Sequence, residues 1–205
     1  MAEPQFADEA VSRTKFDREV AAFRAQAAAY RRRGWYLVHA EFPEAMVLLA
    51  TPNTQPMAIL CGVAFDYTNY DAAPPSVRLV NPMTSEPYKG SELPTQLPKR
   101  VPANDTPVVV KEGLPPQVQF EVLAGQPLMQ AHKPDDIPFL CIAGVREYHE
   151  HPAHSGDHWE LYRSSGAGSL TRLVGIVSKY GLEPIAGFNV QMIPQVSFNV
   201  GPPPE

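Results

Sequence analysis

The sequence has few of the features that mark several common protein classes. It holds only two cysteines, Cys61 and Cys141, and they lie far apart, so it has neither a disulfide framework nor a CxxC zinc motif. Its net charge is −5, whereas nucleic-acid binding needs a basic excess. No apolar run reaches the roughly 20 residues of a membrane span, and the acidic, polar N-terminus is unlike a signal peptide. These absences predict a cytoplasmic protein that binds neither nucleic acid nor membrane.

The length and the proline content set the organisation. The 205 residues are enough for one domain with a real core. There are 23 prolines and 13 glycines, and proline favours extended segments and rigid turns. We expect a single domain over residues 1–205, with a flexible N-terminus (1–11), a proline-rich insertion (83–107) and a C-terminal extension (182–205).

The first half predicts a helix followed by strands. A helix is expected over residues 12–33, with Ser12 as N-cap and Gly34 as its stop. Its apolar face consists of Phe16, Val20, Phe23, Ala27 and Tyr30. Runs rich in β-branched and aromatic residues predict strands at 35–42, 45–50, 57–67 and 76–80. The short loops between the first three predict an antiparallel meander, in which Cys61 is a buried apolar residue.

The second half predicts shorter elements. Further strands are expected at residues 107–110, 117–123 and 137–143, and a helix at 170–180 that stops at Gly181. The fold class that follows is α+β, with an N-terminal helix packed on an antiparallel sheet. The tail beyond the last helix lacks helical periodicity, so we expect it to pair with a sheet edge or a partner.

One stretch, residues 139–163, gathers the residues of reactive chemistry. It reads FLCIAGVREYHEHPAHSGDHWELYR and holds Cys141, Trp159 and four of the six histidines. A thiolate is a strong nucleophile, and nearby positive charge or a histidine can lower the pKa of its thiol. Cys, Glu and His are also zinc ligands. The stretch therefore indicates either a catalytic thiol or a metal site, or else a core cysteine in a structural module.

The order of these pieces resembles the ubiquitin-conjugating (E2) fold. A helix and a meander come first, then a proline-rich segment that enters the fourth strand, then a cysteine, a tryptophan and a helix. In the proline-rich segment the matching residues are Tyr70, Pro74, Pro75, Val77, Leu79 and Pro82. The chain departs from that family in its long segment before Cys141 and in lacking the His-Pro-Asn motif, whose asparagine steadies the oxyanion of acyl transfer.

The resemblance implies a function and partners. Cys141 would accept a ubiquitin-like protein as a thioester from an E1-like enzyme and pass it to an amine of a target protein, without a cofactor. The N-terminal helix would dock the E1-like enzyme, with Arg24, Arg31 and Arg32 as contacts, although such arginines are also common at solvated helix ends.

The candidate assisting residues follow from spacing. On an extended segment Glu147, His149 and His151 share one face. Either histidine could replace the missing asparagine, while Glu147 could orient an imidazole or the amine. Asp157 is a second candidate for the amine. His154 and His158 are expected to be loop residues that bond to backbone, and Trp159 to lie in the core.

The same region also resembles a bacterial family described as a predicted metal-binding domain, found in antiphage operons with E1-like and ubiquitin-like genes. That resemblance implies a phage-defence setting and a zinc site formed by Cys141, Glu147, His149 and His151. A third hypothesis is an E2-like scaffold without catalysis.

Overall fold

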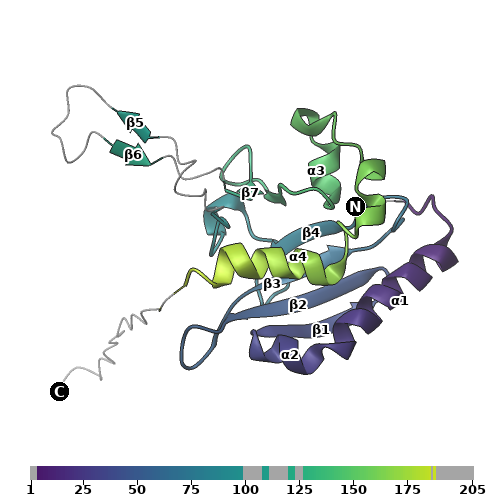
Figure 1. Ribbon diagram of the computed structural model, residues 1–205, viewed down its shortest axis with the longest axis horizontal. Helices are drawn as coiled ribbons and strands as arrows, with labels where there is room; N and C mark the ends of the chain where they lie inside the picture. The colour runs from purple at the N-terminus through teal and green to yellow at the C-terminus, as the bar shows by residue number, and fades with distance from the viewer. Residues whose placement is uncertain (1–3, 99–107, 111–119, 123–126, 186, 188–205) are drawn as a thin grey trace, which may run out of the picture.

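The computed structural model describes residues 4–98, 108–110, 120–122, 127–185 and 187. A four-stranded antiparallel sheet carries helices α1, α2 and α4 on one face, and α3 lies beside β4 (Figure 1). The α+β class predicted from the sequence is confirmed. None of the helices in the described ranges has the length and apolar character that a bilayer crossing requires.

The N-terminal helical region consists of two helices, so the prediction of one helix over residues 12–33 is wrong. The first, α1 (Glu9–Ala25), ends at Gln26, and α2 (Ala27–Arg32) follows. The N-cap is Asp8, whose carboxylate accepts the first free amides of α1. Ser12 instead lies buried inside the helix. An aspartate at the N-terminus also matches the helix dipole, which explains the earlier start.

The segment before α1 is held by Asn69. The side-chain oxygen of Asn69 accepts the amides of Phe6 and Ala7 at 2.7 and 2.9 Å. Ordered structure therefore extends into the region expected to be flexible, although residues 1–3 lie outside the described ranges.

Gly34 ends the helical region as predicted. Its φ of +81° lies in the left-handed region, which suits glycine because it has no Cβ. A Cβ there would also lie 2.1 Å from the carbonyl oxygen of Ala50. The tight approach turns the chain directly from α2 into the first strand.

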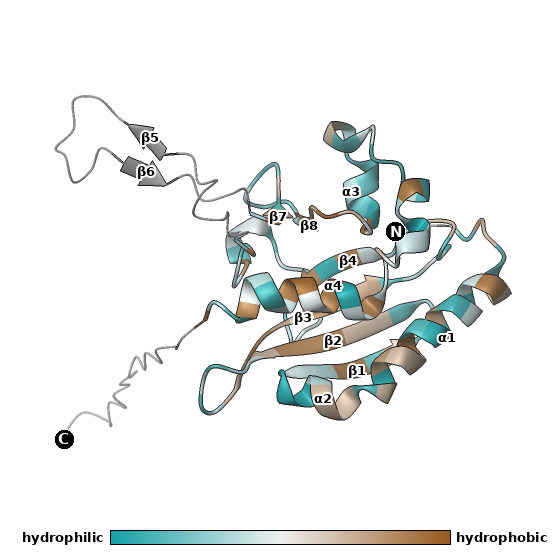
Figure 2. Cartoon of the chain, in the orientation of Figure 1, coloured by the Kyte–Doolittle hydropathy of each residue, from teal (hydrophilic) through white to brown (hydrophobic). Residues whose placement is uncertain are grey.

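The predicted meander is confirmed. Its strands are β1 (Trp35–Glu41), β2 (Glu44–Thr51), β3 (Ala58–Asp66) and β4 (Ser76–Val80), hydrogen-bonded in that order. Each neighbouring pair is antiparallel. Alternate residues of the strands point toward the helices, and the interiors of β2 and β3 are apolar (Figure 2).

The core lies between this sheet and the helices. The predicted apolar face of α1 supplies Phe16, Val20 and Phe23, each at most 4% exposed. Phe16 packs edge-on against Tyr67, with ring centroids 5.5 Å apart. Cys61 is fully buried, as predicted.

Between β4 and the reactive stretch the chain forms small elements. They are the 3-10 turn η1 (Gly90–Glu92), a β5–β6 hairpin (Val108–Val110 and Phe120–Val122) and a β7–β8 pair (Met129–Gln130 and Phe139–Leu140). Strands were predicted at the positions of β5, β6 and β8, of which β8 is shorter than predicted, whereas β7 was not predicted. Part of the 83–107 insertion lies outside the described residues.

The last helix is α4 (Leu170–Val177), which continues into the π-helical turn η7 (Ser178–Leu182). Its buried residues are Leu170, Leu173, Val174 and Val177, the face predicted from their spacing. Gly181 lies inside η7 and does not stop the helix, so that prediction is wrong. Most of the 182–205 extension, with its predicted sheet pairing, lies outside the described residues.

Candidate functional site

Cys141 follows directly after β8, where the short β7–β8 pair fixes its backbone. Its amide donates to the carbonyl of Leu128 at 2.7 Å, and its side chain is half-buried. Burial raises the pKa of the Cys141 thiol, because a thiolate is poorly stabilised away from water. The resting group is therefore a thiol, and a neighbouring base is needed to activate it at neutral pH.

That neighbour is His154, whose Nε2 lies 3.3 Å from Cys141 Sγ. His154 ends the 3-10 turn η4 (Pro152–His154), and its ring stacks on Tyr148 with centroids 4.0 Å apart. We expected His154 to be a loop residue that bonds to backbone through its side chain. The structure instead places the imidazole against the thiol.

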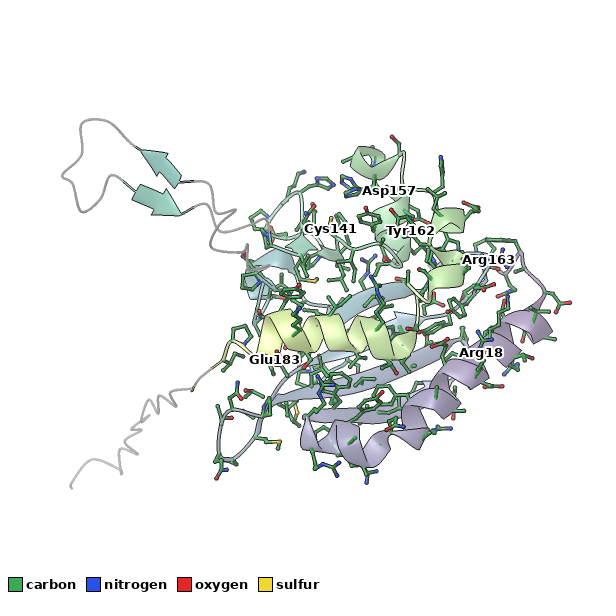
Figure 3. The ribbon with its side chains drawn as sticks, viewed as in Figure 1. Arg18, Cys141, Asp157, Tyr162, Arg163 and Glu183 are labelled. Carbon is green, nitrogen blue, oxygen red and sulfur yellow. The ribbon has the colours of Figure 1, made fainter. Side chains whose placement is uncertain are left out.

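Asp157 lies on the other side of His154. Its Oδ2 is 4.0 Å from His154 Nδ1, and its carboxylate accepts hydrogen bonds from Tyr148 Oη at 2.5 Å and Tyr162 Oη at 3.2 Å. These two hydroxyl donors lower the pKa of the Asp157 carboxyl. Figure 3 shows Cys141, Asp157 and Tyr162 together in the upper part of the view, away from α1. The arrangement is a thiol, an imidazole and a carboxylate in sequence.

The three assisting residues predicted from their spacing do not share a face. Residues 146–150 form the helix α3 (Arg146–Glu150), not an extended segment. Side chains two positions apart on a helix point in nearly opposite directions, because 3.6 residues complete a turn. Glu147 and His149 therefore diverge, and His151 lies beyond the helix as its C-cap.

Glu147 faces the sheet and not the thiol. Its Oε1 accepts a hydrogen bond from Ser76 Oγ and lies 2.9 Å from the guanidinium of Arg78. Both partners belong to β4. In this structure Glu147 therefore fastens α3 to the sheet, and it does not face the Cys141 thiol as the spacing predicted.

His149 joins two loops of the site. Its Nδ1–H donates to the carbonyl of Asp157 at 2.5 Å, and its Nε2 accepts the amide of Gly144 at 3.1 Å. Both ring nitrogens are therefore occupied by backbone, and the ring holds the loop after Cys141 at a fixed distance from the turn of Asp157. This arrangement differs from the oxyanion donor that the spacing predicted, because both ring nitrogens of His149 bond to backbone.

His151 caps a turn. Its Nδ1 accepts the amide of Ala153 at 3.2 Å, and its ring stacks between His132 and Phe139, with centroids 5.4 and 5.1 Å away. The predicted catalytic contact of His151 with the thiol is not made. The contacts that the structure gives Glu147, His149 and His151 are therefore with groups other than the Cys141 thiol.

The predicted zinc ligands are not brought together. Cys141 contacts His154, Glu147 contacts Arg78, and His149 is engaged by backbone at both nitrogens. Within the described ranges, no three Cys, His, Asp or Glu side chains are grouped so that they could hold a metal ion. The geometry therefore does not favour a zinc site formed by Cys141, Glu147, His149 and His151.

The sequence reasoning also missed Arg146, which anchors the site. Arg146 is the first residue of α3, and its side chain is only 8% exposed. It donates to the carbonyls of Thr68 and Pro74 at 2.8 and 3.2 Å. The double proline predicted to enter β4 thus also supplies a carbonyl that fixes α3. One of two arginines in an acidic, histidine-rich stretch gave little sign of this.

Trp159 closes the other side of the region. It is 6% exposed, and its indole N–H donates to the carbonyl of Asp71 at 2.9 Å, which confirms the core placement. The Asp71 carboxylate in turn binds Lys15 and Arg163. Although burial raises the pKa of Asp71, these two cations bring it below its usual value.

The arginines proposed for partner binding lie elsewhere, on the helices. Arg24, Arg31 and Arg32 are exposed, and Arg24 and Arg31 line a cavity of about 370 Å³ with the terminal strand β1. They lie by β1 at one edge of the sheet, whereas Cys141 follows β8, which contacts β4 at the other edge.

Comparison with known proteins gives a family. The sequence profile of the Y4jH-like family matches residues 7–185 of the chain. A relative in Sinorhizobium fredii (strain NBRC 101917 / NGR234), uncharacterized protein y4jH, is 41% identical over 192 residues, which are 94% of this chain and 92% of the relative. The match spans α1, the meander and the reactive stretch alike. The chain therefore belongs to the Y4jH-like family.

Proposed function

We propose that the protein is an E2-like transferase that carries a ubiquitin-like protein as a thioester on Cys141. The observation that carries the proposal is the half-buried thiol in contact with His154. A cysteine beside a histidine is the usual arrangement for nucleophilic acyl transfer. The E1-like donor, the ubiquitin-like protein and the target amine follow from the resemblance to ubiquitin-conjugating enzymes. The phage-defence setting follows from the resemblance to the family of antiphage operons, and the cytoplasm from the features that the sequence lacks.

The arrangement of elements supports this proposal. The α1 helix, the four-stranded meander, the cysteine, the buried Trp159 and the α4 helix occur in the order that the E2 fold would require. The long segment before Cys141 remains a departure from that fold. Chemistry at the thiol also needs no cofactor, since the thioester bond itself stores the energy for transfer.

The direct test is charging of Cys141. The protein is incubated with ATP, an E1-like enzyme and a ubiquitin-like protein of bacterial conjugation operons, and adducts are resolved with and without reductant. We expect a reductant-sensitive adduct that Cys141→Ala abolishes and that Cys141→Ser converts to a stable oxyester. Cys61→Ala is the matched control and should charge normally, because Cys61 is buried in the core. A protein that never charges would be a scaffold instead.

The arginines of α1 and α2 are proposed to bind an acidic segment of the E1-like enzyme. The segment between Glu19 and Glu41 contains Arg24, Arg31 and Arg32 but no Asp or Glu. In a chain with net charge −5 this segregation produces a locally positive surface. Arg24→Glu with Arg31→Glu should slow charging at least about tenfold, and Lys179→Glu on η7 is the control. Equal charging by both variants would refute this contact.

A further inference from the structure

The contacts around Cys141 show more than a nucleophile. We propose that His154 is the general base of the transfer and that Asp157, held by Tyr148 and Tyr162, is the positioning residue that orients it. This assignment rests on the proposed acyl transfer. It differs from the assisting residues suggested by sequence spacing, which the fold turns away from the thiol.

The tautomer of His154 follows from its two neighbours. The carboxylate of Asp157 lies 4.0 Å from Nδ1, so it favours the ring form that carries its proton there. Nε2 is then the free acceptor, and it is the atom 3.3 Å from Cys141 Sγ. A thiol proton can pass along this contact, and the carboxylate stabilises the imidazolium that results.

Asp157 itself is kept ionised and in place. Tyr148 Oη and Tyr162 Oη donate to its two carboxylate oxygens. Tyr148 also supports His154 directly, since the two rings stack. The backbone carbonyl of Asp157 is held by His149. Three side-chain contacts, from Tyr148, His149 and Tyr162, thus determine where Asp157 lies.

The proposed acyl transfer takes place in two steps. The Cys141 sulfur attacks the carbonyl carbon of the incoming thioester as its proton passes to His154 Nε2. The carbon–sulfur bond to the E1-like enzyme breaks, and the departing thiolate takes that proton. In the second step the target amine attacks the Cys141 thioester, the carbon–nitrogen bond forms, and the amine proton returns through His154 to the leaving sulfur of Cys141.

Other ionisable groups surround the pair and enter any pH profile. Tyr148 from α3 and Asp157 from the following turn touch His154. The ring of His151 lies 5.7 Å from that of His154, and Arg172 of α4 donates to the carbonyl of Ala143 in the Cys141 loop. Variants of His154 and Asp157 must therefore be compared with a histidine that does not touch the thiol.

The test measures alkylation of Cys141 by iodoacetamide across pH, with the Cys141 peptide quantified by mass spectrometry. It needs no activating enzyme. Loss of a general base typically costs about 10²–10⁴-fold, and we expect His154→Gln to slow alkylation at pH 7 at least about tenfold and to move the rise in rate to higher pH. Asp157→Asn should move the profile in the same direction by less. His158→Gln, an exposed histidine of the same stretch, is the matched control and should match wild type.

The outcomes separate the two proposals. If His154→Gln has the wild-type pH profile, or if His158→Gln slows alkylation equally, His154 is not the base, even if Cys141 is charged normally. If the profile shifts as expected but no E1-like enzyme charges Cys141, the thiol–imidazole pair stands and the E2-like function falls. Thermal melting of each variant excludes unfolding as the cause of a slower rate.

Discussion

Replacement of Arg146 by methionine is expected to destabilise the protein strongly, because the Arg146 side chain is buried. Its two shorter hydrogen bonds go to the carbonyls of Thr68 and Pro74 at 2.8 and 3.2 Å. Hydrogen bonds to charged groups contribute about 1.5–3 kcal/mol each. Methionine keeps the apolar stem but leaves both carbonyls without a donor. The free energy of unfolding should therefore fall by about 3–5 kcal/mol.

The assay is urea unfolding followed by tryptophan fluorescence, since Trp35 and Trp159 are both buried. Arg163→Met is the matched control. Arg163 pairs with the carboxylate of Asp71 at 2.8 Å, as Arg146 pairs with that of Asp66 at 3.6 Å, but the Arg163 side chain is 46% exposed, and exposed pairs contribute about 0–1 kcal/mol. A loss below about 1 kcal/mol for Arg146→Met, or equal losses for the two variants, would refute the claim that Arg146 anchors α3.

Three further predictions follow from single contacts. Gly34→Ala should lower the free energy of unfolding by about 2 kcal/mol or more in calorimetry, because φ is +81° and the added Cβ would meet the carbonyl of Ala50. Gly166→Ala should lower it by less, because φ is +74° but the space around Gly166 is open. His149→Asn should speed amide exchange around the Cys141 loop, and unchanged exchange would show that the ring does not join the loops. Alkylation of native protein should label Cys141 and spare Cys61, because burial raises the pKa of Cys61 to about 12. Since that folded pKa exceeds the unfolded one, Cys61 contributes stability at neutral pH that is lost as pH rises toward 12. Melting of Cys61→Ala and wild type across pH would detect this loss.

The fold was predictable where the pattern was long. Phe16, Val20 and Phe23 repeat at helical spacing over several turns, and the strands are runs of apolar and β-branched residues separated by short turns. Burial decides both patterns, so the sequence alone placed α1, the meander and the face of α4. The break at Gln26 was missed because Gln26 and the alanines on both sides of it all favour helix.

The site was less predictable because its elements are short. The five residues of α3 span little more than one turn, too few for a periodicity that would distinguish helix from strand. Reading them as extended placed Glu147, His149 and His151 on one face. The contact of Cys141 with His154 depends instead on the turn that starts at Pro152, where proline is compatible with the first position of a helical turn. That proline was the available signal.

Backbone hydrogen bonding distinguishes His149, His151 and His154 from one another, which residue type alone could not do. A tight turn leaves amides and carbonyls that need partners, and imidazole can serve them as donor and acceptor. His149 is used in this way at both nitrogens and His151 at Nδ1. His154 is different, because Nε2 faces a thiol and Nδ1 faces a carboxylate. A histidine whose nitrogens both face side chains can move a proton without releasing the backbone, and for this reason the reactive partner of Cys141 is the histidine that spacing passed over.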